Sequence, residues 1–228
     1  ILRERVVADP TSDNLFREID EDIRQEKYAE LWKKYGVYVI IAAVLMVGGV
    51  AGYQGWRTYD LNTRETASDR LIGAQELIPV DPAAAEQALL SIADDGPDGY
   101  AMLARFQAAA LIGERGDRDL AAAAYWELSQ QDIDPMYKDL AIILGTEQIL
   151  AKTTAPSNPA ELLERLEPVA APGNAWRFSA RELQGVIAWQ TGDIERAREL
   201  FTGLAGDPGA PAGLRARANE ILAVIGDN

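Results

Sequence analysis

The most constraining feature of this sequence is an uninterrupted apolar run over residues 37–55. It reads VYVIIAAVLMVGGVAGYQG and holds no Asp, Glu, Lys or Arg in 19 residues. A bilayer core about 30 Å thick requires roughly 20 apolar helical residues, because lipid offers no hydrogen-bonding partner to an exposed backbone. A buried core helix is the alternative, but such helices are usually shorter and carry a polar face. We therefore predict a transmembrane helix over residues 37–56.

Aromatic and basic side chains flank this run at both ends. Amphipathic rings prefer the headgroup level of a bilayer. At a rise of about 1.5 Å per residue, the interval from Trp32 to Trp56 covers roughly 36 Å, which matches a hydrocarbon slab with its interfaces. Because the run follows 36 residues rich in charged side chains, we interpret it as a retained anchor rather than a signal peptide. The predicted membrane-interface residues are Trp32, Lys33, Lys34, Tyr35, Tyr53, Trp56 and Tyr59.

The distribution of basic residues gives the anchor a direction. Residues 21–36 hold four Lys and Arg side chains, and residues 57–72 hold three. This small excess, together with Lys33 and Lys34 at the interface itself, predicts that the N-terminus is cytoplasmic.

Small residues form one stripe along the predicted membrane helix. Gly48 and Gly52 make a GxxxG pair, and Ala51 and Gly55 make a second small-xxx-small row. Small residues let two membrane helices approach closely, so this face is a candidate docking surface for another membrane protein or for a second copy, which would give a homodimer. The alternative is that glycine is simply common in membrane helices.

Composition removes several classes of function. The net charge is −14, and the residues after Trp56 carry −12 of it, so a nucleic-acid ligand is not expected. The sequence has no Cys and no His, which removes thiol and Ser-His-Asp nucleophiles, haem ligation by those residues and the usual zinc sites. The acidic pairs Asp94-Asp95 and Asp132 with Asp134 lie at helix ends beside Pro or Gly, where capping explains them. We expect no catalytic residue, no cofactor and no metal.

Residues 1–36 form the predicted cytoplasmic segment. Residues 1–11 have no clear period and read as a tail. An amphipathic helix follows, with apolar residues at Leu15, Ile19 and Ile23. This helix leads into the membrane helix. The sequence leaves three arrangements open: the amphipathic helix lies on the lipid headgroups, packs on a partner protein, or extends the membrane helix.

Residues 57–228 have helical spacing throughout, and Pro or Gly punctuates nearly every junction. No segment alternates polar and apolar residues for long enough to predict a strand. The sequence therefore predicts an all-α fold, with candidate helices over residues 63–78, 82–94, 100–114, 117–131, 135–152, 159–170, 175–191, 193–206 and 210–225.

Two of the predicted helix pairs share a register. Gly192, Asp193, Ala197 and Phe201 have the same spacing as the Gly, Asp, Ala and Tyr that begin at Gly116. The glycine suits a tight turn, the Asp caps the second helix, the small Ala lets the helices close together and the aromatic ring fills the gap to the next pair. Gly185 and Ala109 occupy the matching close-contact positions in the first helices.

This spacing, GxxxxxxGDxxxxAxxxF from Gly185 to Phe201, resembles the tetratricopeptide repeat family, and the pair around Gly116 matches it in part. The resemblance implies a degenerate helical-repeat solenoid after the membrane helix. In such solenoids the first helix of each pair lines a concave surface that binds protein segments. Carried onto this sequence, the groove-facing residues are Phe106, Glu182, Val186, Trp189 and Gln190. The alternative for Phe106 and Trp189 is packing between helices.

The whole chain also resembles a narrower group, the YfgM-like family of bacterial inner-membrane proteins. The residues that carry this resemblance are FREIDEDIRQEKYAELWKKYG and GYQGWRTY within residues 16–59, followed by degenerate helical repeats. The resemblance implies a repeat domain in the periplasm over residues 57–228, and a role as an ancillary partner of the SecYEG translocon with the periplasmic chaperone PpiD.

Two functions follow as hypotheses. The first is a membrane-anchored, non-enzymatic interaction module that recruits client or chaperone proteins at the inner membrane. The second is a structural accessory subunit that packs its membrane helix onto a large respiratory or photosynthetic complex, with the repeats as a brace. They differ in which region contacts the partner: the repeat groove in the first, and the glycine stripe in the second.

Overall fold

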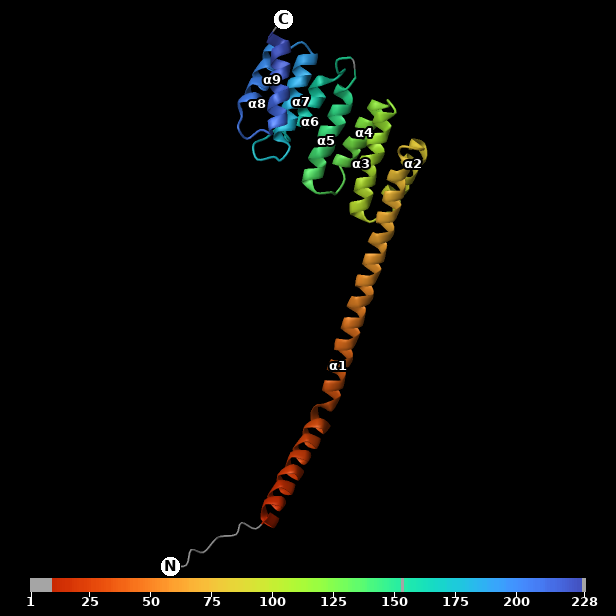
Figure 1. The fold of residues 1–228 in the computed structure, drawn as a ribbon, viewed down its shortest axis with the longest axis vertical. Coiled ribbons are helices and arrows are strands. Elements are labelled where there is room, and N and C mark those ends of the chain that lie inside the picture. The colour runs from red at the N-terminus through yellow and green to blue at the C-terminus, as the bar shows by residue number, and fades with distance from the viewer. Residues whose placement is uncertain (1–9, 153, 227–228) are drawn as a thin grey trace, which may run out of the picture. The chain divides into compact units, whose positions relative to one another are not determined.

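The computed structural model describes residues 10–152 and 154–226, and it describes side chains from residue 30 onward. Every regular element in this part of the chain is an α-helix, so the all-α prediction is confirmed (Figure 1). The chain divides into two compact units, Ile1–Asn62 and Thr63–Asn228. The predicted tail up to residue 9 and the apolar face at Leu15, Ile19 and Ile23 lie outside the described residues and side chains.

The first helix, α1, runs from Pro10–Leu77 as one element. The sequence predicted a separate helix over residues 63–78 and left open whether the amphipathic helix extends the membrane helix; in the structure all three segments are continuous. They merge because no proline occurs between Pro10 and Pro79, and isolated glycines such as Gly36 weaken a helix without ending it.

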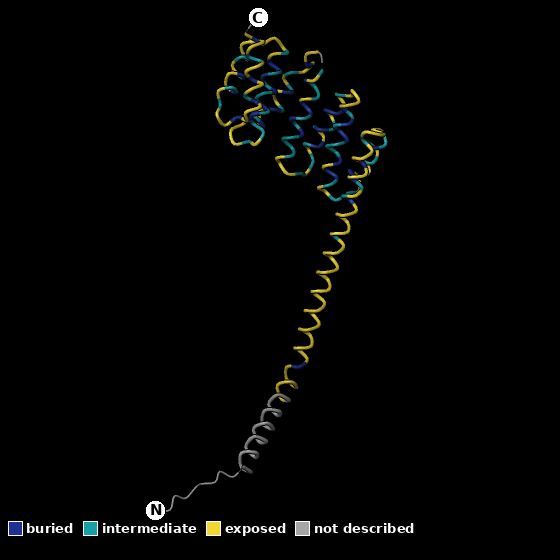
Figure 2. The backbone as a smooth tube through the Cα atoms, viewed as in Figure 1, coloured by how far each residue is buried: buried dark blue, intermediate teal, exposed yellow. Residues whose placement is uncertain are grey.

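The middle of α1 is exposed in this structure. Every residue from Glu30 to Tyr59 is exposed except Gly36. A Cβ atom built on Gly36 would lie 3.2 Å from the Trp32 ring. The exposed stretch of α1 is yellow in Figure 2. Exposed fractions reach 70% at Leu45 and 73% at Trp56. α1 contains a segment long and apolar enough to cross a membrane, with a mean hydropathy of 2.0 over its best window. Its apolar surface is not covered by protein among the described residues.

The remaining helices correspond to the predicted ones, with ends that differ by at most four residues. α6 shows the largest difference, because it ends at Leu166 and not at Ala170. Pro168 has no N–H to donate, and its ring would clash with the carbonyl four residues earlier in a continuing helix. The bounds are α2 Pro82–Asp95, α3 Asp98–Glu114, α4 Arg118–Ser129, α5 Pro135–Leu150, α6 Pro159–Leu166, α7 Arg177–Gln190, α8 Ile194–Gly206 and α9 Ala212–Gly226.

Three helices begin with the same device, a capping side chain followed by proline. Asp81, Asp134 and Asn158 accept hydrogen bonds from backbone N–H groups two or three residues later, at 3.0, 2.8 and 3.4 Å. The following proline lacks an N–H that the first helical turn leaves unpaired anyway. These local signals set the starts of α2, α5 and α6.

The second unit is a stack of antiparallel helices, each packed mainly on its neighbours in sequence (Figure 1). α5 also packs on α7, and α7 on α9, which continues the stack beyond the short α6. The last turns of α1 belong to this unit, because Leu71 and Ala74 are buried in a cluster with Leu89 of α2 and Leu111 of α3. This neighbour-to-neighbour packing is the arrangement of a helical-repeat solenoid.

Candidate partner-binding surfaces

The two turns with a shared register have the same backbone geometry. Gly116 and Gly192 adopt φ values of +102° and +83°, a conformation that favours glycine. In both turns the glycine N–H donates to the carbonyl three residues back, and the following Asp N–H donates to the carbonyl five residues back. These paired bonds form a Schellman motif, which satisfies the free carbonyls of α3 and α7.

The capping prediction is confirmed for Asp193 and wrong for Asp117. The Asp193 carboxylate accepts a hydrogen bond from the Arg196 backbone N–H at 3.1 Å. The Asp117 side chain makes no such bond, because its Oδ2 accepts from the Arg115 guanidinium at 2.8 Å. The identical residue therefore caps one helix and forms an ion pair before the other.

The close approach predicted at Gly185 is present. A Cβ atom built on Gly185 would lie 2.8 Å from Cζ of Phe201, and the Phe201 ring is completely buried. Ala197 and Ala109 are also buried, at 0% and 1% exposure. The register thus identified residues that hold α7 and α8 together.

The residues expected on the groove face of α7 have different surroundings. Trp189 is 38% exposed, whereas Val186 is half-buried against two core clusters. The Gln190 amide donates to the Leu150 carbonyl at 3.0 Å, which ties α7 to the end of α5. Trp189 is the residue of this set with a large apolar surface open to a partner.

Glu182 is held by an ion pair inside the second unit. Its carboxylate accepts two hydrogen bonds from the Arg217 guanidinium of α9, at 2.7 and 2.8 Å. Partial burial raises the pKa of Glu147 on α5, the nearby Glu182 carboxylate raises it further, and Arg217 opposes both. Glu182 therefore links α7 to α9, and its own charge is paired with that of Arg217.

Phe106 lies between helices. Its side chain is half-buried against Met102 and Leu128, and its ring centroid lies 6.0 Å from that of Tyr125 and 6.5 Å from that of Tyr137. The Tyr125 hydroxyl donates to the Phe106 carbonyl at 3.4 Å. These contacts join α3, α4 and α5, so Phe106 offers a partner less free surface than Trp189.

The small-residue stripe of α1 is open. A Cβ atom built on Gly48, Gly52 or Gly55 would meet no other atom within 4 Å, and Ala51 is exposed. At about 100° per residue these four positions share one side of the helix. The interface aromatics Tyr53, Trp56 and Tyr59 are likewise exposed, as are Trp32, Lys33, Lys34 and Tyr35.

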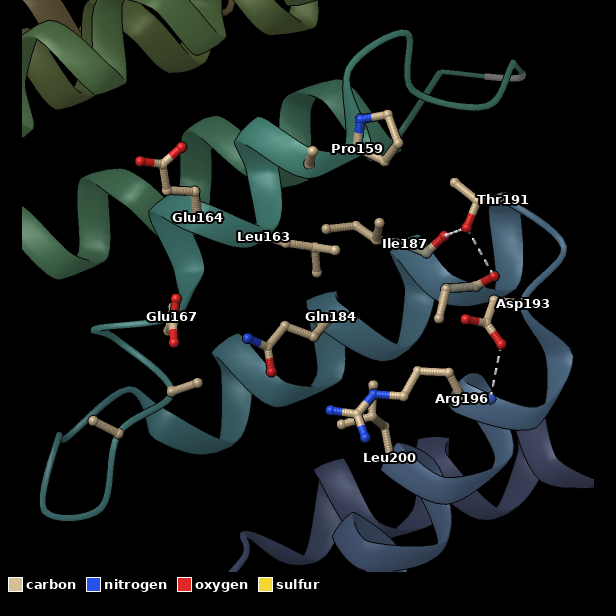
Figure 3. Close-up of a pocket in the computed structure, with 14 residues that line it drawn as sticks. Pro159, Leu163, Glu164, Glu167, Gln184, Ile187, Thr191, Asp193, Arg196 and Leu200 are labelled. Carbon is tan, nitrogen blue, oxygen red and sulfur yellow. Dashed lines mark hydrogen bonds between the residues drawn. The ribbon is translucent and has the colours of Figure 1, made fainter.

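A further surface was not expected from the sequence. A groove with a volume of about 950 Å³ lies between α6, α7 and α8 (Figure 3). Leu163 of α6, Ile187 of α7 and Leu200 of α8 line it with apolar side chains, and Glu164 and Glu167 lie on its α6 side. The i, i+3 spacing of these two Glu residues indicates that they lie on one face of the chain near α6. Nothing in the sequence, however, shows that this face lies near α8.

One residue of each acidic pair named in the sequence analysis has a structural role. Asp134 caps α5, and Asp95 pairs with Arg70 at 2.8 Å. In the part of the chain with described side chains, no group of three or more acidic residues is arranged to hold a metal ion.

The comparisons with known proteins agree with this geometry. The pattern of the tetratricopeptide repeat-like domain family matches residues 29–207. The chain belongs to this family. A curated relative, the ancillary SecYEG translocon subunit of Aggregatibacter actinomycetemcomitans, is 26% identical over 185 residues, which cover 80% of this chain and 87% of that protein. No solved structure matches the chain. Both matches confirm the resemblance to the YfgM-like family, and family membership indicates an interaction module rather than an enzyme.

Proposed function

We propose that this protein is a single-pass inner-membrane protein that acts as an ancillary partner of the SecYEG translocon. Its N-terminal segment is cytoplasmic, residues 37–56 cross the bilayer, and its repeat unit faces the periplasm. One observation carries this proposal: the same chain combines a long, exposed apolar segment in α1 with a helical-repeat unit. The name of the relative, which matches over most of both chains, supports the choice of partner.

The mechanism is tethering. A membrane anchor confines the repeat unit to the surface where translocated segments emerge, which raises its effective concentration there. Modest affinity at the Trp189 face is then sufficient to recruit a client or a chaperone such as PpiD. The interface residues, with Trp32 and Trp56 at the two ends, fix the depth of the anchor in the lipid.

A second candidate is the bracing subunit of a respiratory or photosynthetic complex. The open stripe at Gly48 and Gly52 favours it, because a partner helix can approach these backbones closely. In this function the membrane helix carries the partner contacts, or pairs with a second copy, and the repeat face contributes little.

Co-purification of the full chain from crosslinked membranes, with partners identified by mass spectrometry, tests both candidates. Cutting the chain after Trp56 is expected to abolish recovery of translocon subunits, because the tether is lost. Trp189→Ala is expected to reduce recovery of periplasmic proteins several-fold while the translocon is retained.

Two matched variants serve as controls. Leu120→Ala removes an apolar side chain on α4 that is more exposed than Trp189, at 61% against 38%, and is expected to change nothing. Gly49→Leu adds bulk to α1 about 100° from Gly48, whereas Gly48→Leu with Gly52→Leu adds it on the stripe. Loss of all partners in the stripe variant, with Trp189→Ala silent, would favour the bracing subunit. Undiminished recovery of the translocon after the cut would overturn the proposed function.

A further inference from the structure

The groove between α6, α7 and α8 lies on the opposite side of α7 from Trp189. Gln184, Ile187, Ala188 and Thr191 line the groove from α7. At about 100° per residue, the centre of this set is roughly 160° around the helix from the set that includes Trp189. α7 therefore presents two independent surfaces, one on each side of the repeat stack.

The floor of the groove is apolar and accessible. Leu163 is 39% exposed, and it points toward Ile187 across the groove in Figure 3. Leu200 of α8 closes the other side. A volume of about 950 Å³ is at the upper end of the range for pockets that bury a ligand, so several aliphatic side chains fit.

The charges at the rim are unequally satisfied. On the α8 side, Asp193 caps the helix, and the Arg196 guanidinium pairs with Glu199 at 2.6 Å. On the α6 side, the exposed carboxylates of Glu164 and Glu167 form no ion pair with the side chains described here. The groove thus combines an apolar floor with an acidic edge that is free to pair.

We propose that this groove binds a short amphipathic helical segment of a partner protein, with aliphatic residues on one face and Lys or Arg beside them. The aliphatic side chains enter between Leu163 and Leu200, and basic side chains one turn apart pair with Glu164 and Glu167, which are themselves one turn apart. The proposal goes beyond the proposed function, which concerns the Trp189 face and the membrane helix.

The test uses the full chain in nanodiscs of zwitterionic lipid and a fluorescent peptide of about four helical turns. The peptide has Leu at i, i+3, i+4 and i+7 and Lys at its flanking positions. Fluorescence anisotropy is expected to show saturable binding above that of empty nanodiscs. Peptides with Glu in place of Lys, or Ser in place of Leu, are expected to bind at least about tenfold more weakly.

Variants locate the binding site. Leu163→Arg is expected to weaken binding of the Lys peptide about tenfold. The double variant Glu164→Lys with Glu167→Lys is expected to have the same effect at low salt and a smaller effect at high salt, because salt screens the charges. Leu120→Arg makes the same apolar-to-Arg change, and Glu127→Lys a single Glu-to-Lys change, at exposed positions of α4, and both are expected to stay within about twofold. Far-UV circular dichroism checks that each variant is folded.

Three outcomes would overturn the proposal: binding no stronger than to empty nanodiscs, equal binding of the Lys and Glu peptides, or equal loss in the groove and α4 variants. The peptide comparison uses the unaltered chain, so it decides the question even if a groove variant misfolds. The peptide comparison and the variant comparison both measure binding to the groove, so neither depends on the translocon or on Trp189.

Discussion

At the scale of single residues, the repeat register brings Gly185 of α7 directly against the Phe201 ring of α8. A Cβ atom at Gly185 would approach a buried ring to 2.8 Å, and close packing around that ring leaves it little room to move. Gly185→Ala is expected to lower the free energy of unfolding by about 1–3 kcal/mol through overpacking. Thermal unfolding of the full chain in detergent, followed by circular dichroism, measures the change.

Gly203 of α8 supplies the control, because a Cβ atom there would meet nothing within 4 Å. Gly203→Ala is expected to stabilise the protein by up to about 1 kcal/mol, since alanine favours the helix. Equal unfolding temperatures for the two variants would show that the Phe201 ring gives way to a methyl group.

The sequence was sufficient to identify Gly185 and Phe201, because both belong to one repeat with fixed spacing. It was not sufficient for Glu182, whose partner Arg217 is 35 residues away on α9. Whether Glu182 of α7 meets Arg215 or Arg217 of α9 depends on the relative rotation of the two helices. Propensity and spacing within each helix contain no information about that rotation.

At the scale of elements, the two repeat turns differ in how their Asp residues act. Asp193 caps α8, whereas Asp117 pairs with Arg115, which is half exposed. Asp193→Ala is expected to lower the free energy of unfolding by about 1 kcal/mol, a typical loss for a helix cap. Asp117→Ala is expected to cost less than about 0.5 kcal/mol, because an exposed ion pair contributes little.

Urea unfolding of both variants at low and high salt separates these effects. The loss in Asp193→Ala is expected to persist in salt, whereas the small loss in Asp117→Ala is expected to disappear, because salt screens exposed charges. Equal losses that respond equally to salt would contradict the different roles of the two side chains.

The starts of the helices followed from local signals, and their relations in space did not. Pro82, Pro135 and Pro159 mark three starts, each after a capping residue. The continuity of α1 from the apolar run into residues 63–77 was missed because the end of the apolar run suggested a boundary where the backbone has none. The α6–α8 groove was missed because it depends on how α6 and α8 are placed against α7, which spacing within each helix does not determine.

At the scale of the whole molecule, α1 contributes residues to both compact units, and the two parts of the helix have different surfaces. Its residues from Glu30 to Tyr59 expose an apolar surface suited to lipid, and Leu71 and Ala74 lie in the core of the repeat unit. A sequence boundary at the end of the apolar run is therefore a boundary of environment, not of helix. The predicted limit of the membrane domain at residue 56 and the division of the fold after Asn62 describe different properties.

This shared use of α1 predicts where the chain can be cut without loss of the repeat fold. A fragment of residues 57–228 keeps Ala67, Leu71 and Ala74, which are at most 8% exposed. A fragment of residues 79–228 removes them and uncovers Leu89 and Leu111. Loss of a buried Leu alone costs about 2–5 kcal/mol, so the shorter fragment is expected to melt roughly 10 °C lower or without a cooperative transition.

Circular dichroism of the purified fragments during heating measures this difference. A fragment of residues 63–228 is the matched control, since it loses further exposed helix but none of the buried residues, and it is expected to melt with the 57–228 fragment. If the fragment of residues 79–228 melted at the same temperature as the longer two, the last turns of α1 would be dispensable to the repeat core. The exposed apolar face that their loss leaves on α2 and α3 is the reason to expect otherwise, because a terminal repeat must be covered to remain soluble.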